Sequence, residues 1–103
     1  MTTTLHIENT VRDYDSWKAV FDKFERVRQD AGVQHVRLCR TGADGRTVHI
    51  ELDFPGPEQA SAFREVLQRI WSTPQSQAEL AGHAVAEVRE LVEDRPLTGV
   101  PVG

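Results

Sequence analysis

The stretch ENTVRDYDSWKAVFD, residues 8–22, predicts a strand that passes directly into a helix. In its first part and just upstream, Leu5, Ile7 and Val11 alternate with polar residues. This period of two is typical of a strand with one apolar and one polar face, and we expect the strand to cover residues 2–10. The apolar face of such a strand must be buried against another element, and the residues that follow can form a helix that packs on it.

The helix that follows is expected over residues 14–31. Asp13 is its candidate N-cap, because the carboxylate can accept hydrogen bonds from the first free backbone N–H groups. Asp15 places a negative charge in the first turn, where the helix dipole favours it. The apolar residues recur at helical spacing and form one stripe: Trp17, Val20, Phe21, Phe24, Val27 and Ala31. Gly32 is expected to end the helix in the left-handed conformation.

The rest of the chain repeats the alternation of strands and helices. Strands are expected at residues 33–40, 47–54 and 83–93, a helix at 58–71, and a short helix at 74–81. Asp44-Gly45 is a hairpin signal between the second and third strands. Pro74 suits the first position of the short helix, and Gly82 is expected to close it.

The resulting order is βαββαβ with a short extra helix before the last strand. This order predicts an α+β, ferredoxin-like fold with a four-stranded antiparallel sheet in the order 4-1-3-2 and the helices on one face. We expect a single domain over residues 1–93 and a C-terminal tail over residues 94–103, because the tail has too little apolar content to fold alone.

Composition excludes several classes of protein. The chain has 103 residues, 39% of them hydrophobic, which suits one domain with its own core. Its formal charge of −4 lacks the basic footprint of a nucleic-acid binder, so no nucleic-acid partner is expected. No apolar run approaches the ~20 residues that span a membrane, and the N-terminus does not resemble a signal peptide. With Cys39 as its only cysteine, the protein is expected to be soluble and cytoplasmic.

The motif V-x-D-Y-D-x-W-K-x-x-F-D at residues 11–22 resembles the dimeric α+β barrel superfamily, as do ELDF, AFREVL and STPQSQAELAGH further along. The resemblance covers residues 4–93 and is nearest to small proteins of the antibiotic biosynthesis monooxygenase-like and polyketide cyclase-like kinds. It implies a homodimer in which two sheets pair face to face, with a ligand cavity between each sheet and its helices. Members of such families include cofactor-free oxygenases, cyclases, isomerases, haem-handling enzymes and proteins with no known reaction.

The resemblance implies a small cavity enzyme that acts on an aromatic or polyketide-like molecule without a cofactor, as a monooxygenase or a cyclase. Such chemistry needs donors that stabilise an enolate. Four residues are the candidate catalytic donors: Asn9, Tyr14, Trp71 and His83. Seven more are expected to line the substrate pocket: Ile7, Trp17, Phe21, Ile50, Leu52, Phe63 and Leu67.

Structural roles remain open for the same residues. Asp13 and Asp15 suit a helix start, and Trp17 and Trp71 suit a core. Asn9 can bond locally, and His83 can simply begin the last strand. A non-catalytic barrel that binds a ligand would keep the same pocket.

Haem or metal binding is a further alternative. Asn9, Trp71 and His83 resemble the set that haem-degrading members use, although His83 follows the third helix and Phe54 stands where a Trp is expected. The other sheet face groups polar side chains: His6, Glu8, His35, Arg37, His49 and Glu51. They could bind zinc or iron, but a network in a dimer interface is the simpler interpretation, with Cys39 as a small buried residue beside it. No metal site is predicted.

Overall fold

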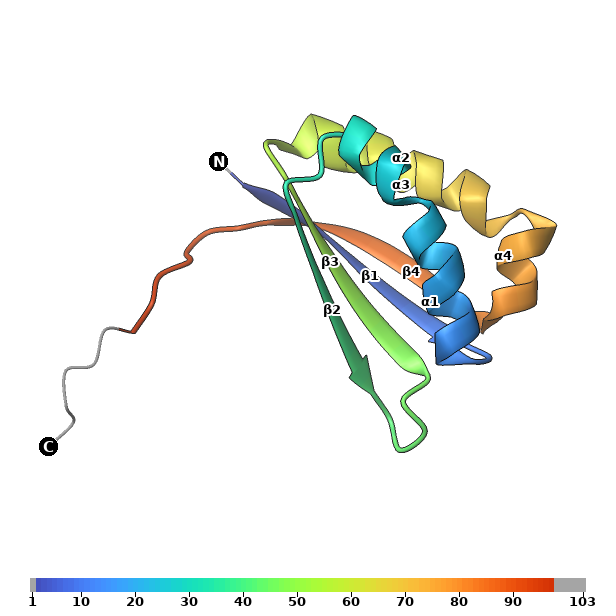
Figure 1. Ribbon diagram of the computed structural model, residues 1–103. Coiled ribbons are helices and arrows are strands. Elements are labelled where there is room, and N and C mark those ends of the chain that lie inside the picture. Colours follow the sequence, from blue (N-terminus) through green and yellow to red (C-terminus); the bar gives the residue numbers. More distant parts are fainter. Residues whose placement is uncertain (1, 98–103) are drawn as a thin grey trace, which may run out of the picture.

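The computed structural model in Figure 1 describes residues 2–97, except the side chain of His83. Its elements follow the predicted order, with the first helix divided in two. They are β1 (Thr3–Val11), α1 (Tyr14–Lys23), α2 (Glu25–Asp30), β2 (His35–Thr41), β3 (Thr47–Phe54), α3 (Pro57–Trp71), α4 (Pro74–Glu79) and β4 (Leu80–Glu90).

The four strands form one antiparallel sheet in the order β2-β3-β1-β4, which confirms the predicted order. β3 covers the predicted residues, because strict alternation from residue 47 to residue 54 leaves no other register. All four helices lie on one side of the sheet, as predicted (Figure 1). The other side is left open.

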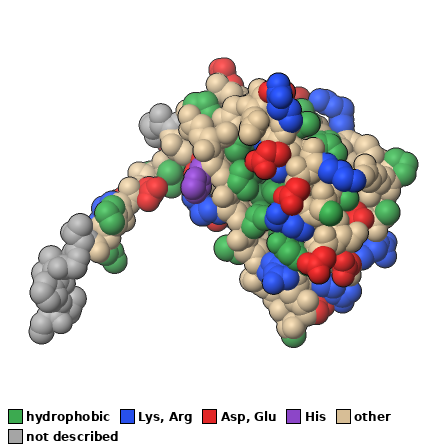
Figure 2. Space-filling model, in the orientation of Figure 1, with side chains coloured by type: hydrophobic (Ala, Val, Ile, Leu, Met, Phe, Trp, Pro, Cys, Tyr) green, Lys and Arg blue, Asp and Glu red, His purple; other side chains and the backbone are tan. Residues whose placement is uncertain are grey.

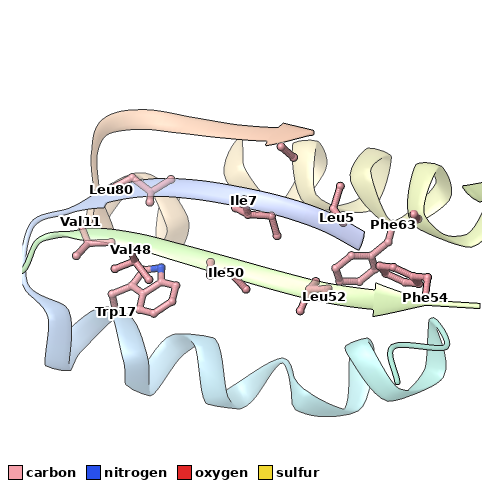
Figure 3. Close-up of a cluster of buried hydrophobic side chains, with 12 residues drawn as sticks. Leu5, Ile7, Val11, Trp17, Val48, Ile50, Leu52, Phe54, Phe63 and Leu80 are labelled. Atoms are coloured by element: carbon pink, nitrogen blue, oxygen red, sulfur yellow. The ribbon is translucent and has the colours of Figure 1, made fainter. Parts of the chain in front are cut away.

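The core lies between the sheet and the helices (Figure 3). On the strands, the side chains that face the helices are almost fully buried: Leu5, Ile7, Val11, Val48, Ile50, Leu52 and Phe54. Trp17 from α1 and Phe63 from α3 meet them from the helical side (Figure 3). Phe63 packs on Phe54 with ring centroids 5.7 Å apart.

The start of α1 confirms the predicted N-cap. Asp13 accepts a hydrogen bond of 2.9 Å from the backbone N–H of Ser16. Gly32 has φ of 91°, also as predicted for the residue that ends the second part of this segment.

The prediction of one continuous helix over residues 14–31 was wrong. Phe24 has φ of −95° and ψ of 12°, so the helix stops at Lys23 and starts again at Glu25. The carbonyl of Phe21 accepts from the backbone N–H of Phe24 and from the side chain of Arg28. These two donors satisfy a carbonyl that would otherwise be free at the end of α1.

The prediction that Gly82 closes the short helix was also wrong. α4 ends at Glu79, and Gly82 lies inside β4 with φ of 102°. The register between β1 and β4 shifts between Asn9 and Val11, which places a bulge opposite the end of β1. β4 ends at Glu90, three residues before the predicted end of the strand.

The tail begins where β4 ends. Residues 91–97 have no regular structure and run away from the sheet (Figure 1), while residues 98–103 lie outside the described part. The exact limit between domain and tail therefore stays a prediction.

The open face of the sheet is polar. Cys39 lies on this face and is exposed in the single chain, so its burial in a dimer interface stays a prediction. Val33, which precedes β2, packs against the core. The register of β2 turns Val36 and Leu38 toward the helices and the odd-numbered residues of the strand, Cys39 among them, outward. On the surface seen in Figure 2, which includes the outer side of the helices, acidic and basic side chains are mixed as well. No helix in the described chain has both the length and the hydropathy to cross a membrane.

Candidate functional site

A cavity of about 80 Å³ lies between the sheet and the helices. All seven residues predicted for a substrate pocket contribute to its walls: Ile7, Trp17, Phe21, Ile50, Leu52, Phe63 and Leu67. The structure therefore brings these side chains together, while their role in binding stays a prediction. α3 packs on the sheet more closely than α1 and α2 do, and residues of all three helices line the cavity.

Trp17 and Phe21 on α1 form one side of the cavity and belong to a row of three aromatic rings. Trp17 is stacked on Phe21 with ring centroids 5.0 Å apart, and Tyr14 lies 6.0 Å from Trp17 at the other end. A guanidinium covers each end of the row, with Arg40 4.2 Å from the ring centre of Tyr14 and Arg28 3.7 Å from that of Phe21. Cation–π contacts of this kind hold flat rings in fixed orientations.

Asn9 contributes the amide group that the sequence predicted on the helical side of β1. Its side chain is 3% exposed and lines the cavity. The buried Oδ1 has no hydrogen-bond partner among the described residues. An unpaired buried acceptor costs about 1–3 kcal/mol, so the fold tolerates a local cost at this position. The adjacent bulge of β4 is the kind of irregularity that often accompanies functional sites.

Arg28 lines the same cavity and was missed in the sequence. It is 5% exposed, its Nη2 donates to the carbonyl oxygen of Phe21 at 2.9 Å, and its buried Nε has no partner. Burial lowers the pKa of Arg28, with Glu25 and Asp22 opposing this. Spacing could have found the residue: Arg28 follows Trp17 by eleven positions and Phe21 by seven, which places it at the centre of the apolar stripe.

Glu79 is a second polar residue of the cavity that sequence reasoning missed. It ends α4, lines the cavity, and accepts a hydrogen bond of 2.9 Å from Ser16 Oγ. Its backbone carbonyl accepts from the N–H of Arg12, so two contacts fix it against the start of α1. These partners are more than sixty residues away in sequence, which is why local patterns gave no signal.

The other three predicted donors have different outcomes. Trp71 lines the cavity at the end of α3, and its carbonyl accepts from the side chain of Gln77. Tyr14 is not among the cavity residues, because its ring faces Trp17 and Arg40. The side chain of His83 lies outside the described part of the chain.

On the open face, two of the three histidines predicted to lie together do so. The rings of His6 and His49 are 5.7 Å apart, and His49 Nε2 lies 3.0 Å from Thr41 Oγ1. His35 is at the other end of β2, opposite Asp53, and is exposed. Within the described residues, no group of three His, Cys, Asp or Glu side chains could hold a metal ion. The metal alternative therefore has no geometric support on this face.

Ion pairs cross the open face instead. Arg37 lies 3.3 Å from Glu51 and 3.6 Å from Asp53, and Thr4 donates to Asp53 at 2.8 Å. The Glu51 hydrogen bond raises the pKa of Arg37, while burial opposes it. These contacts lie within one chain, so a network of the same side chains in a dimer interface stays a prediction.

No protein-family model matches the sequence, and no curated protein matches it either. Solved structures do match. One from Bordetella bronchiseptica, provisionally named an antibiotic biosynthesis monooxygenase, has a TM-score of 0.68 at 13% identity, over 89% of this chain and 98% of that chain. A dimeric ferredoxin-like protein from an uncultured marine organism has a TM-score of 0.63 at 6% identity, over 94% and 93% of the two chains.

A third solved structure, from Nitrosomonas europaea, has the same provisional name as the Bordetella protein. Its TM-score is 0.51 at 10% identity, over 84% of this chain and 86% of that chain. Sequence identities this low show a shared fold. The chain thus has the ferredoxin-like α+β fold of proteins named for antibiotic biosynthesis monooxygenases, as its sequence predicted.

Proposed function

We propose that the protein is a small cavity enzyme of the cofactor-independent monooxygenase type, acting on an aromatic or polyketide-like compound. The observation that carries this proposal is the cavity itself, an apolar space whose walls include the unpaired amide oxygen of Asn9. Pockets with mostly apolar walls and a few converging polar groups are the usual form of small-molecule sites. The names of two structural neighbours support the same class.

The polar groups of the cavity suit the formation of an enolate. In the proposed reaction, the carboxylate of Glu79 takes a proton from an acidic CH₂ of the substrate, leaving an electron-rich anion. The amide of Asn9 donates through its nitrogen to the enolate oxygen, and Trp71 adds an indole N–H. Dioxygen then oxidises the anion. The CH₂ becomes a carbonyl, one oxygen atom enters the product, and the other leaves as water with the two hydrogens.

The cavity is too small for an aromatic substrate unless its wall moves. At about 80 Å³ it holds dioxygen or a few waters, but a cavity that admits benzene measures roughly 150 Å³. A ring therefore enters only if the wall moves outward. The α1–α2 segment is the suitable part, since it packs on the sheet less closely than α3 does and its helix is interrupted at Phe24. The described residues that line the cavity include no His, Cys, Met or Tyr that could ligate a haem iron, so haem is not favoured.

The test uses anthrone, which has an acidic CH₂, as a probe substrate with purified protein, EDTA and catalase. We expect oxygen uptake above the protein-free rate, with anthraquinone formed in equal amount to the oxygen consumed. An Arg26→Met variant serves as a control, because this exposed residue on α2 is away from the cavity. Loss of a polyketide-like probe without oxygen uptake would identify a cyclase instead. Binding without any turnover would identify a ligand-binding barrel.

We also propose that the protein is a cytoplasmic homodimer whose open sheet faces meet. The dimeric description of a structural neighbour supports this. His6 lies on that face, and its pKa is lowered from 6.5, mainly by burial and then by Arg89. Glu51 raises the pKa, His49 lowers it, and Glu8 raises it. A second copy over this face would remove more water and lower the pKa of His6 further.

Acidification is therefore expected to weaken the dimer. Because protonation of His6 is disfavoured where it is buried, the contribution of neutral His6 to association is fully present above pH 6.5 and is lost as the pH falls through its lowered pKa. Sedimentation from pH 8 to pH 5 should show a rising dissociation constant for the wild type and a flatter profile for His6→Gln. Arg26→Met, at an exposed position of α2 away from the open face, should behave as the wild type. A monomer at every pH would contradict the homodimer.

A further inference from the structure

Arg28 is an unusual residue for the wall of an apolar cavity. It is 5% exposed, and its neighbours along that wall include Phe21, Phe24 and Val27. Charged side chains are rarely buried to this degree unless they are paired. Since an arginine side chain stays protonated inside proteins, this position is a fixed positive charge beside the cavity.

The hydrogen bonds of this guanidinium are incomplete. It has five N–H donors, and the described chain provides one acceptor, the carbonyl of Phe21. The Nε–H is buried and has no partner. The guanidinium plane lies over the Phe21 ring, 3.7 Å from its centre, so the ring contacts one face of the group and makes no hydrogen bond to its edge.

The charge of Arg28 is unmatched as well. No carboxylate in residues 2–97 lies within ion-pair distance of it. Of the two acids that act on it from further away, Asp22 is paired with Lys18 at 2.6 Å. A buried cation without a counter-ion is destabilising, and a ligand with a negative charge would offset that effect.

From this geometry we infer that Arg28 recognises a carboxylate on the ligand of the cavity. The ligand class is an aromatic or polyketide-like acid whose apolar body lies among the rings and whose carboxylate meets the free edge of the guanidinium. An arginine fork matches two carboxylate oxygens at once, which a lysine cannot do. The inference rests on the proposed function, because it names the substrate class of the same cavity.

The test compares benzoate with benzamide, which has the same ring and nearly the same shape but no charge. Binding is followed by NMR through the indole N–H signals of Trp17 and Trp71, which both line the cavity. We expect the wild type to bind benzoate at least about tenfold more tightly than benzamide, as charged hydrogen bonds predict. Arg28→Met should remove this preference and leave the affinity for benzamide within about threefold, because that part of binding is apolar burial.

Two further variants separate recognition from folding. Arg26→Met makes the same charge change on the exposed side of α2 and should keep the full preference for benzoate. Arg28→Lys keeps the charge without the fork, and it should show an intermediate preference even if Arg28→Met fails to fold. Equal binding of the two probes by the wild type would overturn the carboxylate inference and leave the cavity proposal standing. Binding of neither probe would overturn both.

Discussion

Asn9→Leu is expected to yield a protein that is more stable and nearly inactive. The substitution removes the buried Oδ1 that has no partner and places methyl groups against an apolar cavity. Relieving one unsatisfied acceptor should raise the free energy of unfolding by about 1 kcal/mol, measured by urea denaturation. Loss of a donor to the developing enolate should lower the turnover number for anthrone by about 10²–10³-fold.

Asn9→Ala is the matched control for this result. It removes the same amide but leaves the space empty, so turnover should fall equally while the gain in stability is smaller. A stability–activity trade-off of this kind is common where an active site keeps an unfavourable polar group. If Asn9→Leu instead destabilised the fold and left turnover unchanged, the amide would have a structural role and the proposed reaction would lose its main support.

Phe54→Ala is expected to have the largest effect on stability. Phe54 is fully buried at the end of β3, and its ring packs on Phe63. Truncation of a buried Phe to Ala costs about 3–5 kcal/mol, which is a large part of the roughly 5–15 kcal/mol of a typical domain. Urea denaturation should show this loss, while Phe54→Leu should cost less than about 1.5 kcal/mol.

The same pair of variants tests the limits of the cavity. Phe54 is not a cavity residue, although its partner Phe63 is. Phe54→Leu should therefore bind benzamide as the wild type does. A loss of less than 1 kcal/mol for Phe54→Ala would mean that this end of the core is loosely packed, in conflict with the complete burial of the ring.

The sequence predicted the sheet well because a strand needs only alternation. A shift of one residue in β3 would move Ile50 and Leu52 from the core to the open face, so their register has no close competitor. The N-cap at Asp13 was equally accessible, since it depends on residues three positions apart. Such local signals also identified the seven apolar residues that the structure gathers around the cavity.

The polar part of the site was harder to predict. Arg28 was overlooked because the stripe was followed through apolar residues, and Val27 was chosen although it is 38% exposed. No glycine or proline stands at Phe24, so the sequence did not predict the interruption of the helix there. The position of the Glu79 carboxylate depends on its hydrogen bond from Ser16, and that of the Tyr14 ring depends on its contact with Arg40 from β2. Both positions are therefore set by tertiary contacts. A sequence pattern gives the face of a helix but does not give the partner that its side chain meets.

The bulge of β4, which lies opposite the segment from Asn9 to Val11, also affects how this protein can change over evolutionary time. An insertion or deletion within a regular strand turns every later side chain to the opposite face. At residues 81–83 the pairing with β1 is already irregular, and Gly82 adopts φ of 102° there. A change of length at this point would leave the pairs from Leu5 to Asn9 in place and move Leu80 and α4 with Glu79. Related proteins could therefore differ in the acid that faces the cavity while the sheet beneath it stays the same.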